Sequence, residues 1–232
     1  MTLRPGWRAL PGRALRAIVA SRGAIMAPLG AGWEAELLLI RATRRLVPML
    51  LSDAAALQIL IAVRAARRLD GAMAEAGVFH GGSARLICHA KGDAPLHLFD
   101  VFETLQAGSA AETSGDAATV RDHFRETHGR QSAVEKLLAP YPAVHIHTGV
   151  FPETAHIVAH ERFAFVHLDL DLPGATRAAL DFFHPRLAPG AILIGDDYAD
   201  REVRKVFGTF FADRPDTVIE LPWGQVMVVR QP

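Results

Sequence analysis

Two apolar segments that each end in aspartates constrain the fold of this chain more than any other feature of its sequence. The first, Phe163–Asp171, is apolar up to its last three residues except for His167. The second, Ala191–Asp197, has the same character on a smaller scale. Apolar residues near helical spacing lie between them, so the region predicts a strand, a helix and a second strand. Strands joined in this way run parallel and are buried on both faces, which indicates an α/β fold.

The four aspartates of these segments are Asp169, Asp171, Asp196 and Asp197. The carboxyl ends of parallel strands meet at one edge of a sheet, where ligands bind in open α/β folds. Carboxylates this close together repel one another unless a cation lies between them, and oxygen ligands favour a hard ion such as Mg²⁺, Ca²⁺ or Mn²⁺. A single aspartate after a strand is also a common turn residue or helix N-cap, and for Asp171 this alternative predicts a cap of the helix starting near Gly174.

The chain has 232 residues, half of them apolar, which suffices for one α/β core. We expect this domain over residues 51–232, after an N-terminal helical arm over residues 1–50. The first 32 residues are basic and contain no Asp or Glu. Such an arm could be a loosely docked helix or a segment that contacts another subunit. The second interpretation would make the protein a homodimer.

Composition also bears on partners and location. The formal net charge is zero, which gives no reason to expect nucleic acid or acidic membranes as partners. No apolar run reaches the roughly 18 residues that a membrane span needs. The single cysteine, Cys88, excludes an internal disulfide and fits a reducing compartment, so we expect a cytoplasmic protein.

A second candidate site lies in the first half of the chain. Ala72–Ser83 predicts a short strand, a glycine turn and the start of a helix, whose N-terminal N–H groups suit a carboxylate or phosphate. The spacing is not G-x-G-x-x-G, so this segment alone specifies no ligand. The next strand, Leu96–Asp100, ends in an acid, which in nucleotide-binding folds accepts hydrogen bonds from ribose.

The end of the chain predicts an antiparallel hairpin. Thr217–Leu221 and Gln225–Arg230 have the character of strands, and Pro222-Trp223-Gly224 provides a tight connection between them. Such a hairpin would close one side of the sheet.

Five short motifs follow one another along the chain. They are E-x-G-V-x-x-G-G-S at Glu75–Ser83, F-D-x-F-E at Phe99–Glu103, G-x-F-P-E-T at Gly149–Thr154, H-x-D-x-D-L at His167–Leu172 and P-G-x-x-x-x-x-D-D-Y at Pro189–Tyr198. In this order they make the chain resemble the macrocin O-methyltransferase family over about residues 51–211. These are class I S-adenosylmethionine-dependent enzymes that methylate sugar hydroxyls. The resemblance implies a Rossmann-like, seven-stranded, mostly parallel sheet with a C-terminal antiparallel hairpin and extra N-terminal helices.

The resemblance also implies a role for each matching residue. The metal ligands, for Mg²⁺ or another hard divalent cation, would be Asp169, Asp196 and Asp197. Asp171 would be the catalytic base that takes a proton from the acceptor. The residues around S-adenosylmethionine would be Glu75, Gly77, Phe79, Gly81, Gly82, Ser83, Asp100 and Phe102. The acceptor would be a hydroxyl of a small molecule, a sugar or glycoside.

Two other functions stay open at this point. A type-A glycosyltransferase also places D-x-D after an apolar strand, to hold Mn²⁺ and a nucleotide sugar, which would explain Asp169 and Asp171 only. A non-catalytic binding protein of the methyltransferase fold is the other alternative. It is suggested by Pro173, because the resembling family usually has Tyr there.

Overall fold

The computed structural model describes residues 32–102 and 129–232. In chain order its elements are α2 (Glu34–Leu46), α3 (Asp53–Ala66), β1 (Ala72–Ala76), α4 (Gly82–Ala90), β2 (Leu96–Asp100), α6 (Gln131–Leu138), β3 (Val144–Thr148), η3 (Glu153–Val158), β4 (Phe163–Leu168), α7 (Pro173–Phe183), η4 (His184–Arg186), β5 (Leu187–Gly195), η5 (Asp197–Ala199), α8 (Arg201–Phe211), β6 (Thr217–Glu220) and β7 (Val226–Val229). Most of the predicted N-terminal arm, residues 1–31, lies outside the described residues.

The described strands form one seven-stranded sheet in the order β3-β2-β1-β4-β5-β7-β6. Strands β1 to β5 pair in parallel, whereas β7 is antiparallel to both β5 and β6. The predicted fold class, a mostly parallel sheet with a closing antiparallel hairpin, is therefore confirmed. The direction of strand order reverses between β1 and β4, and crevices at such a point bind ligands in α/β folds.

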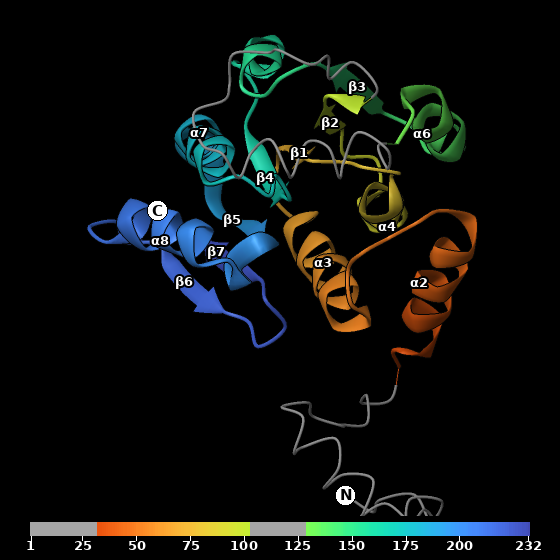
Figure 1. The fold of residues 1–232 in the computed structure, drawn as a ribbon, viewed down its shortest axis with the longest axis horizontal. Helices are drawn as coiled ribbons and strands as arrows, with labels where there is room; N and C mark the ends of the chain where they lie inside the picture. Colours follow the sequence, from red (N-terminus) through yellow and green to blue (C-terminus); the bar gives the residue numbers. More distant parts are fainter. Residues whose placement is uncertain (1–31, 103–128) are drawn as a thin grey trace, which may run out of the picture. The chain divides into compact units, whose positions relative to one another are not determined.

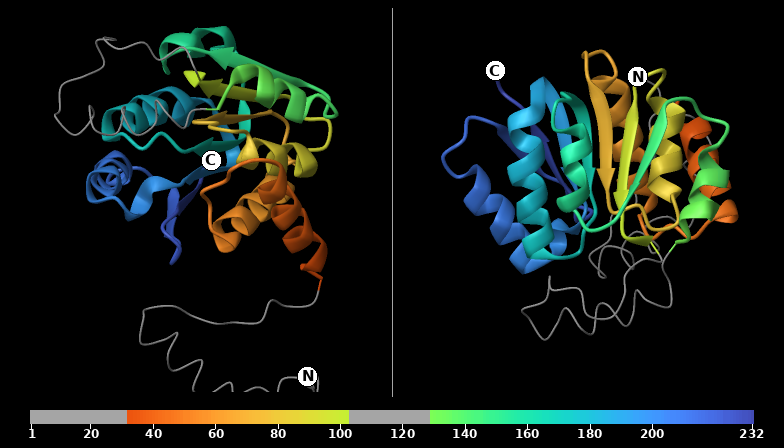
Figure 2. Two further views of the ribbon diagram at one scale, coloured as in Figure 1. Left: turned by 45° about the vertical axis from the view of Figure 1, so that its right-hand side comes forward. Right: turned by 90° about the horizontal axis from the view of Figure 1, so that it is seen from above.

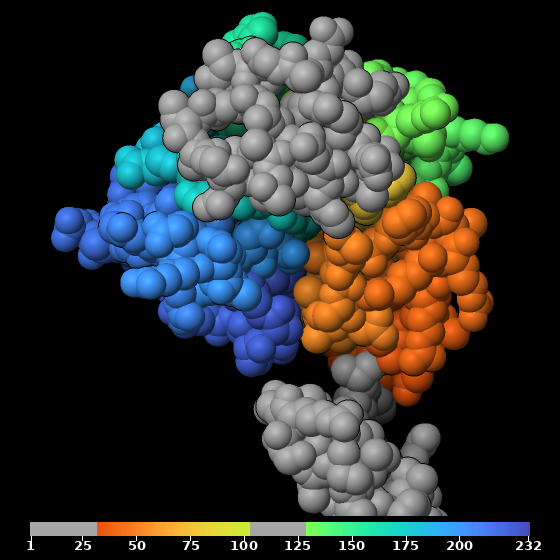
Figure 3. Space-filling model, viewed as in Figure 1, coloured from red at the N-terminus to blue at the C-terminus, as the bar shows by residue number. Residues whose placement is uncertain are grey.

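Helices cover both faces of the sheet (Figures 1 and 2). One side carries α3, α4 and α6, and the other carries α7 and α8. At the surface α3 meets the C-terminal hairpin, where Gln58 Nε2 lies 3.6 Å from Met227 Sδ (Figure 3). All residues of β1 and β4 are buried, as expected for central strands between two helical layers. None of the described helices has the length and hydropathy needed to cross a membrane.

Local sequence explains where several helices begin. Ser52 caps α3 by accepting a hydrogen bond from the Ala55 N–H at 3.1 Å. Asp200 caps α8 by accepting from Glu202 and Val203. Leu172, not Asp171, is the N-cap of α7, and no side chain caps that helix, so the alternative role for Asp171 is wrong.

The prediction for the second acidic segment was too short at its start. Strand β5 begins at Leu187 and continues through Pro189 and Gly190, whereas the sequence indicated a start at Ala191. Its pairing with β4 is irregular here, because Phe163 pairs with Leu187 whereas Phe165 pairs with Ile192. Gly190 has a φ of 82°, which a glycine adopts without strain, and so the extra residues fit within the strand.

A pair of histidines links β2 to the edge strand β3. His97 Nδ1 lies 3.0 Å from His147 Nε2, and the His145 ring stacks on His97 at 5.0 Å. Burial, followed by the neighbouring histidines, lowers the pKa of His97 to about 4, and the pKa of His147 is also lowered. Both rings are therefore neutral in the folded protein at neutral pH.

We expect stability to fall as the pH drops from about 6.5 towards 4. Histidine in the unfolded chain has a pKa near 6.5, so in this window the unfolded state binds more protons than the folded state. His97 alone should account for up to about 3 kcal/mol of this loss. Urea unfolding between pH 4 and 7 would measure it, and His97→Gln should flatten the pH dependence whereas the exposed control His156→Gln should not. If the unfolding free energy of His97→Gln depends on pH as steeply as that of the unchanged protein, His97 is not the cause of the loss.

Candidate active site

The candidate site lies at the carboxyl edge of the sheet, where β1, β4 and β5 end. The backbone pairing continues one residue beyond each strand, because Asp169 N–H donates to Ala76 O and Asp196 N–H donates to Leu168 O, both at 2.9 Å. The ends of the three strands are thereby held side by side. A separate cavity of about 650 Å³, lined by Arg67–Ala72 and Lys91–Pro95, lies where the chain enters β1 and β2, at the opposite edge.

The glycine turn after β1 contacts the acidic segment directly. Gly77 has a φ of 87°, and a Cβ atom at this position would lie only 1.7 Å from the carbonyl oxygen of Asp169. Only glycine fits here. The turn therefore adjoins the acidic segment, and the two sites that the sequence suggested separately are one continuous region.

Asp100 fixes this turn with its side chain. Its Oδ2 accepts hydrogen bonds from the N–H groups of Val78 and Phe79 at 2.6 and 2.8 Å, and its Oδ1 accepts from Phe102 N–H at 2.8 Å. Phe79 and Phe102 have φ values of 54° and 44°, a conformation that is costly for residues with a side chain and that these bonds help to hold. A carboxylate offers about four lone-pair sites, so one on Oδ1 is left for a ligand.

The turn leads into α4, whose first residues are buried. Gly81 is its N-cap, with no capping side chain, and Gly82 and Ser83 form its first turn. Their backbone N–H groups are the ones that a helix leaves without internal partners. The residues of this turn that were predicted to bind S-adenosylmethionine therefore lie around one helix N-terminus.

Glu75 has a partner that the sequence did not reveal. Its Oε1 lies 2.8 Å from His167 Nδ1, and both side chains are fully buried on the paired strands β1 and β4. Burial alone would lower the pKa of His167, but the hydrogen bond to Glu75 and its charge raise that pKa to about 9. Glu75 Oε2 and His167 Nε2 have no hydrogen-bond partner among the described residues. The only sequence signal was a polar residue inside each of two apolar strands.

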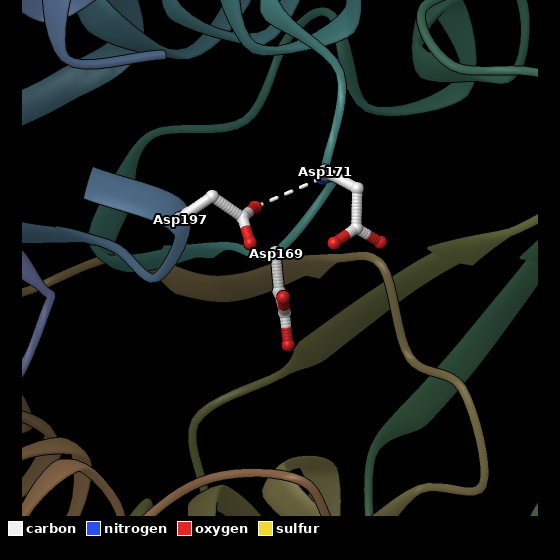
Figure 4. A group of neighbouring side chains, drawn as sticks. All are labelled: Asp169, Asp171 and Asp197. Carbon is white, nitrogen blue, oxygen red and sulfur yellow. Dashed lines mark hydrogen bonds between the residues drawn. The ribbon is translucent and has the colours of Figure 1, made fainter. Parts of the chain in front are cut away.

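Three aspartates form an acidic cluster beside the turn (Figure 4). Asp169, Asp171 and Asp197 each offer an oxygen, and these atoms lie within 4.8 Å of one another. The Asp171 N–H also donates to Asp197 Oδ2 at 2.8 Å, while Asp171 has a φ of 59°. The fourth aspartate, Asp196, accepts a hydrogen bond from Gln225 Nε2 at 2.6 Å. Its assignment as a metal ligand stays a prediction, as do the assignments of the other three.

The electrostatics of this cluster fit a cation. Burial and the charge of Asp196 raise the pKa of Asp169 well above its usual value. Partial burial and the adjacent Asp197 raise the pKa of Asp171 to about 7, and burial raises the pKa of Asp197. Carboxylates in this arrangement resist ionisation unless a positive charge neutralises them. Their oxygen atoms are the donors that Mg²⁺ prefers, so the residues fit the predicted hard cation.

Comparison with known proteins finds a matching family. The model of the macrocin-O-methyltransferase (TylF) family matches residues 54–225. A curated relative from Streptomyces olivaceus, 8-demethyl-8-(2,3-dimethoxy-alpha-L-rhamnosyl)-tetracenomycin-C 4'-O-methyltransferase, is 31% identical over 159 residues. That alignment covers 62% of this chain and 59% of the relative, so the match spans about three fifths of the relative's length.

Solved structures share the fold at lower sequence identity. The O-methyltransferase NovP superposes with a TM-score of 0.66 at 20% identity and covers 76% of this chain and 79% of its own. CalS11, a TDP-rhamnose 3'-O-methyltransferase, gives 0.55 at 14% identity, with 87% and 96% covered. An O-methyltransferase from Bacillus cereus, in complex with SAH, gives 0.54 at 16% identity, with 94% and 97% covered.

Proposed function

Because the chain belongs to the macrocin O-methyltransferase family, we propose that it transfers the methyl group of S-adenosylmethionine to a hydroxyl of a sugar or glycoside, assisted by Mg²⁺ or another hard divalent cation. One observation carries this proposal: the glycine turn at Gly77 touches the backbone of Asp169. A donor bound at the turn and a cation bound by the acidic cluster would therefore be neighbours. A sugar acceptor is suggested by the sugar named in the curated relative and in CalS11.

The residues around the turn suit the methyl donor. Bound there, S-adenosylmethionine supplies a methyl group activated by a sulfonium. The N–H groups at Gly82 and Ser83 suit its amino-acid carboxylate, because a helix N-terminus favours negative charge. The lone pair left on Asp100 suits one ribose hydroxyl. Phe79 and Phe102, held by Asp100, would shape the walls of this site.

The acidic cluster suits the metal and the acceptor. Asp169 and Asp197, with Asp196 beside them, would hold the cation. When bound, this cation lowers the pKa of the acceptor hydroxyl and orients it. Asp171 belongs to the same cluster and is the exposed member of its three aspartates, so its carboxylate is open to an acceptor hydroxyl bound beside the cation. We assign Asp171 as the general base that takes the acceptor's proton.

The other functions left open by the sequence have less support. The family match includes the glycine turn and both acidic segments, which a glycosyltransferase reading of D-x-D does not explain. A non-catalytic role does not account for three aspartates that gather their oxygen atoms beside the glycine turn.

The cellular setting stays a prediction. Burial raises the pKa of the Cys88 thiol to about 12, so this residue is an inert thiol, compatible with a reducing cytoplasm. We also expect a homodimer and a role in secondary metabolism.

The proposed function is tested by measuring S-adenosylhomocysteine formation with a panel of nucleotide sugars, glycosides and free sugars in the presence of Mg²⁺. At least one sugar should give acceptor-dependent turnover. Binding of S-adenosylmethionine should be measurable by calorimetry without acceptor. If nucleotide sugars bind while S-adenosylmethionine does not, the glycosyltransferase alternative would replace this proposal.

Asp100→Ala is expected to weaken donor binding by about 10–150-fold. The reason is that removing a charge-assisted hydrogen bond costs about 1.5–3 kcal/mol, and the turn also loses its three internal bonds to Asp100. Calorimetry with S-adenosylmethionine measures the change. The exposed Asp93→Ala provides a matched control and should bind as the unchanged protein does. Equal donor affinity in both variants would remove Asp100 from the donor site.

A further inference from the structure

Gln225 is a buried polar residue at the carboxyl edge of the sheet to which no role has been given so far. It lies just before β7, whose Val226 pairs with Gly195 of β5, and is therefore beside Asp196. Its side chain is only 1% exposed. The Gln225 carbonyl oxygen accepts from Leu221 N–H at 2.8 Å, which closes the hairpin turn and fixes the backbone.

The orientation of the Gln225 amide follows from its two partners. Trp223 Nε1 donates to Gln225 Oε1 at 3.0 Å, and Gln225 Nε2 donates to Asp196 Oδ1 at 2.6 Å. An indole N–H can only donate, and a carboxylate can only accept. The amide oxygen must therefore face Trp223 and the amide nitrogen must face Asp196. The reversed amide would lose both hydrogen bonds.

The hairpin turn also touches the segment that carries the acidic cluster. Ala199 N–H, in η5, donates to Gly224 O at 3.1 Å. Asp197 of the cluster is the first residue of η5. The turn thus contacts the chain on both sides of the cluster residue, through Asp196 before it and Ala199 after it.

The type of group that donates the hydrogen bond to Asp196 matters as well. An amide fixes the position of a carboxylate without neutralising it, whereas Lys or Arg in the same place would compete with a metal for the charge. Gln225 therefore fixes the Asp196 carboxylate at a defined place next to the cluster.

We propose that Gln225, oriented by Trp223, is a positioning residue for the metal site and fixes the Asp196 carboxylate for cation binding. This inference rests on the proposed function. Hydrogen-bond partners of metal-binding carboxylates commonly change metal affinity 10–100-fold when they are removed. Neither Gln225 nor Trp223 needs to contact S-adenosylmethionine for this role.

The test compares three variants with the unchanged protein by Mg²⁺ calorimetry in the presence of S-adenosylhomocysteine. Gln225→Met keeps the length of the side chain but has no amide, and should weaken Mg²⁺ binding about 10–100-fold. Trp223→Phe keeps an aromatic ring but lets the Gln225 amide rotate, and should weaken binding less. Gln231→Met is the control, because Gln231 lies in the same C-terminal region and its amide donates to Thr217 instead.

A double variant separates positioning from a general effect on folding. If Trp223 acts only through Gln225, then Trp223→Phe should add nothing to Gln225→Met in Mg²⁺ affinity. Additive losses, or equal Mg²⁺ affinity in Gln225→Met and the unchanged protein, would overturn the inference. If Gln225→Met does not fold, Trp223→Phe alone decides: unchanged Mg²⁺ affinity would overturn it. An unchanged protein that binds no Mg²⁺ would instead overturn the metal role in the proposed function, and this inference with it.

Discussion

Replacing Asp171 by Asn is expected to lower turnover by about 10²–10⁴-fold, with donor affinity close to that of the unchanged protein and no fall in melting temperature. Asparagine keeps the shape of the side chain but cannot accept a proton from the acceptor. The fold should hold because Asp171 caps no helix, and the hydrogen bond from its backbone N–H to Asp197 is kept by the substitution. Rates at saturating donor and Mg²⁺ measure the effect.

A matched control for this prediction is available in the next helix. Asp181→Asn removes an exposed carboxylate of α7 that pairs with Arg177, and it should leave turnover unchanged. A fall of less than tenfold in Asp171→Asn would contradict this role, and His80, Tyr198 or solvent would then be tested as the base. A large fall accompanied by a lost melting transition would show that Asp171 supports the fold instead.

Removal of the divalent cation should abolish turnover, and added Mg²⁺ should restore it. Asp169→Asn should remove this response, because Asp169 is a proposed ligand and its ionised form needs a positive neighbour. If exhaustively dialysed protein keeps full turnover, the metal role is wrong.

Stability gives a second measurement of the same site. A carboxyl whose pKa is raised by folding favours the protonated form, so at neutral pH, above its unfolded pKa, ionised Asp169 makes the metal-free protein less stable. Asp169→Asn should therefore raise the melting temperature of the metal-free protein and abolish its further rise with Mg²⁺. The exposed Asp213→Asn should behave as the unchanged protein in both respects. A lower melting temperature for Asp169→Asn without metal would contradict this account.

Much of the fold could be predicted because its central strands have an unambiguous character. The run Phe163–Leu168 is long, apolar and followed by acids, and it forms β4 within the predicted bounds. The start of β5 could not be predicted, since Pro189-Gly190 usually interrupts a strand. Here that stretch is taken up by an irregularity in pairing with β4.

The site was less accessible to sequence reasoning, because its contacts join residues far apart in the chain. The convergence of the aspartates could be predicted from their place after parallel strands. The bond from Gln225 to Asp196 could not, because it depends on the register between β5 and β7. The hydrogen bonds that Asp100 accepts from Val78, Phe79 and Phe102 could not be predicted either. They depend on the positive φ angles of Phe79 and Phe102.

The buried pair of Glu75 and His167 restricts how this protein can change over evolutionary time. Removal of one member of a buried charged pair typically destabilises a protein by about 3–5 kcal/mol, because the other charge is left without a partner. Replacement of both by apolar residues of similar volume can be nearly neutral. A lineage that loses the pair must therefore pass through an unstable single substitution or change both positions together, and this barrier favours keeping the two residues even where neither is needed for catalysis.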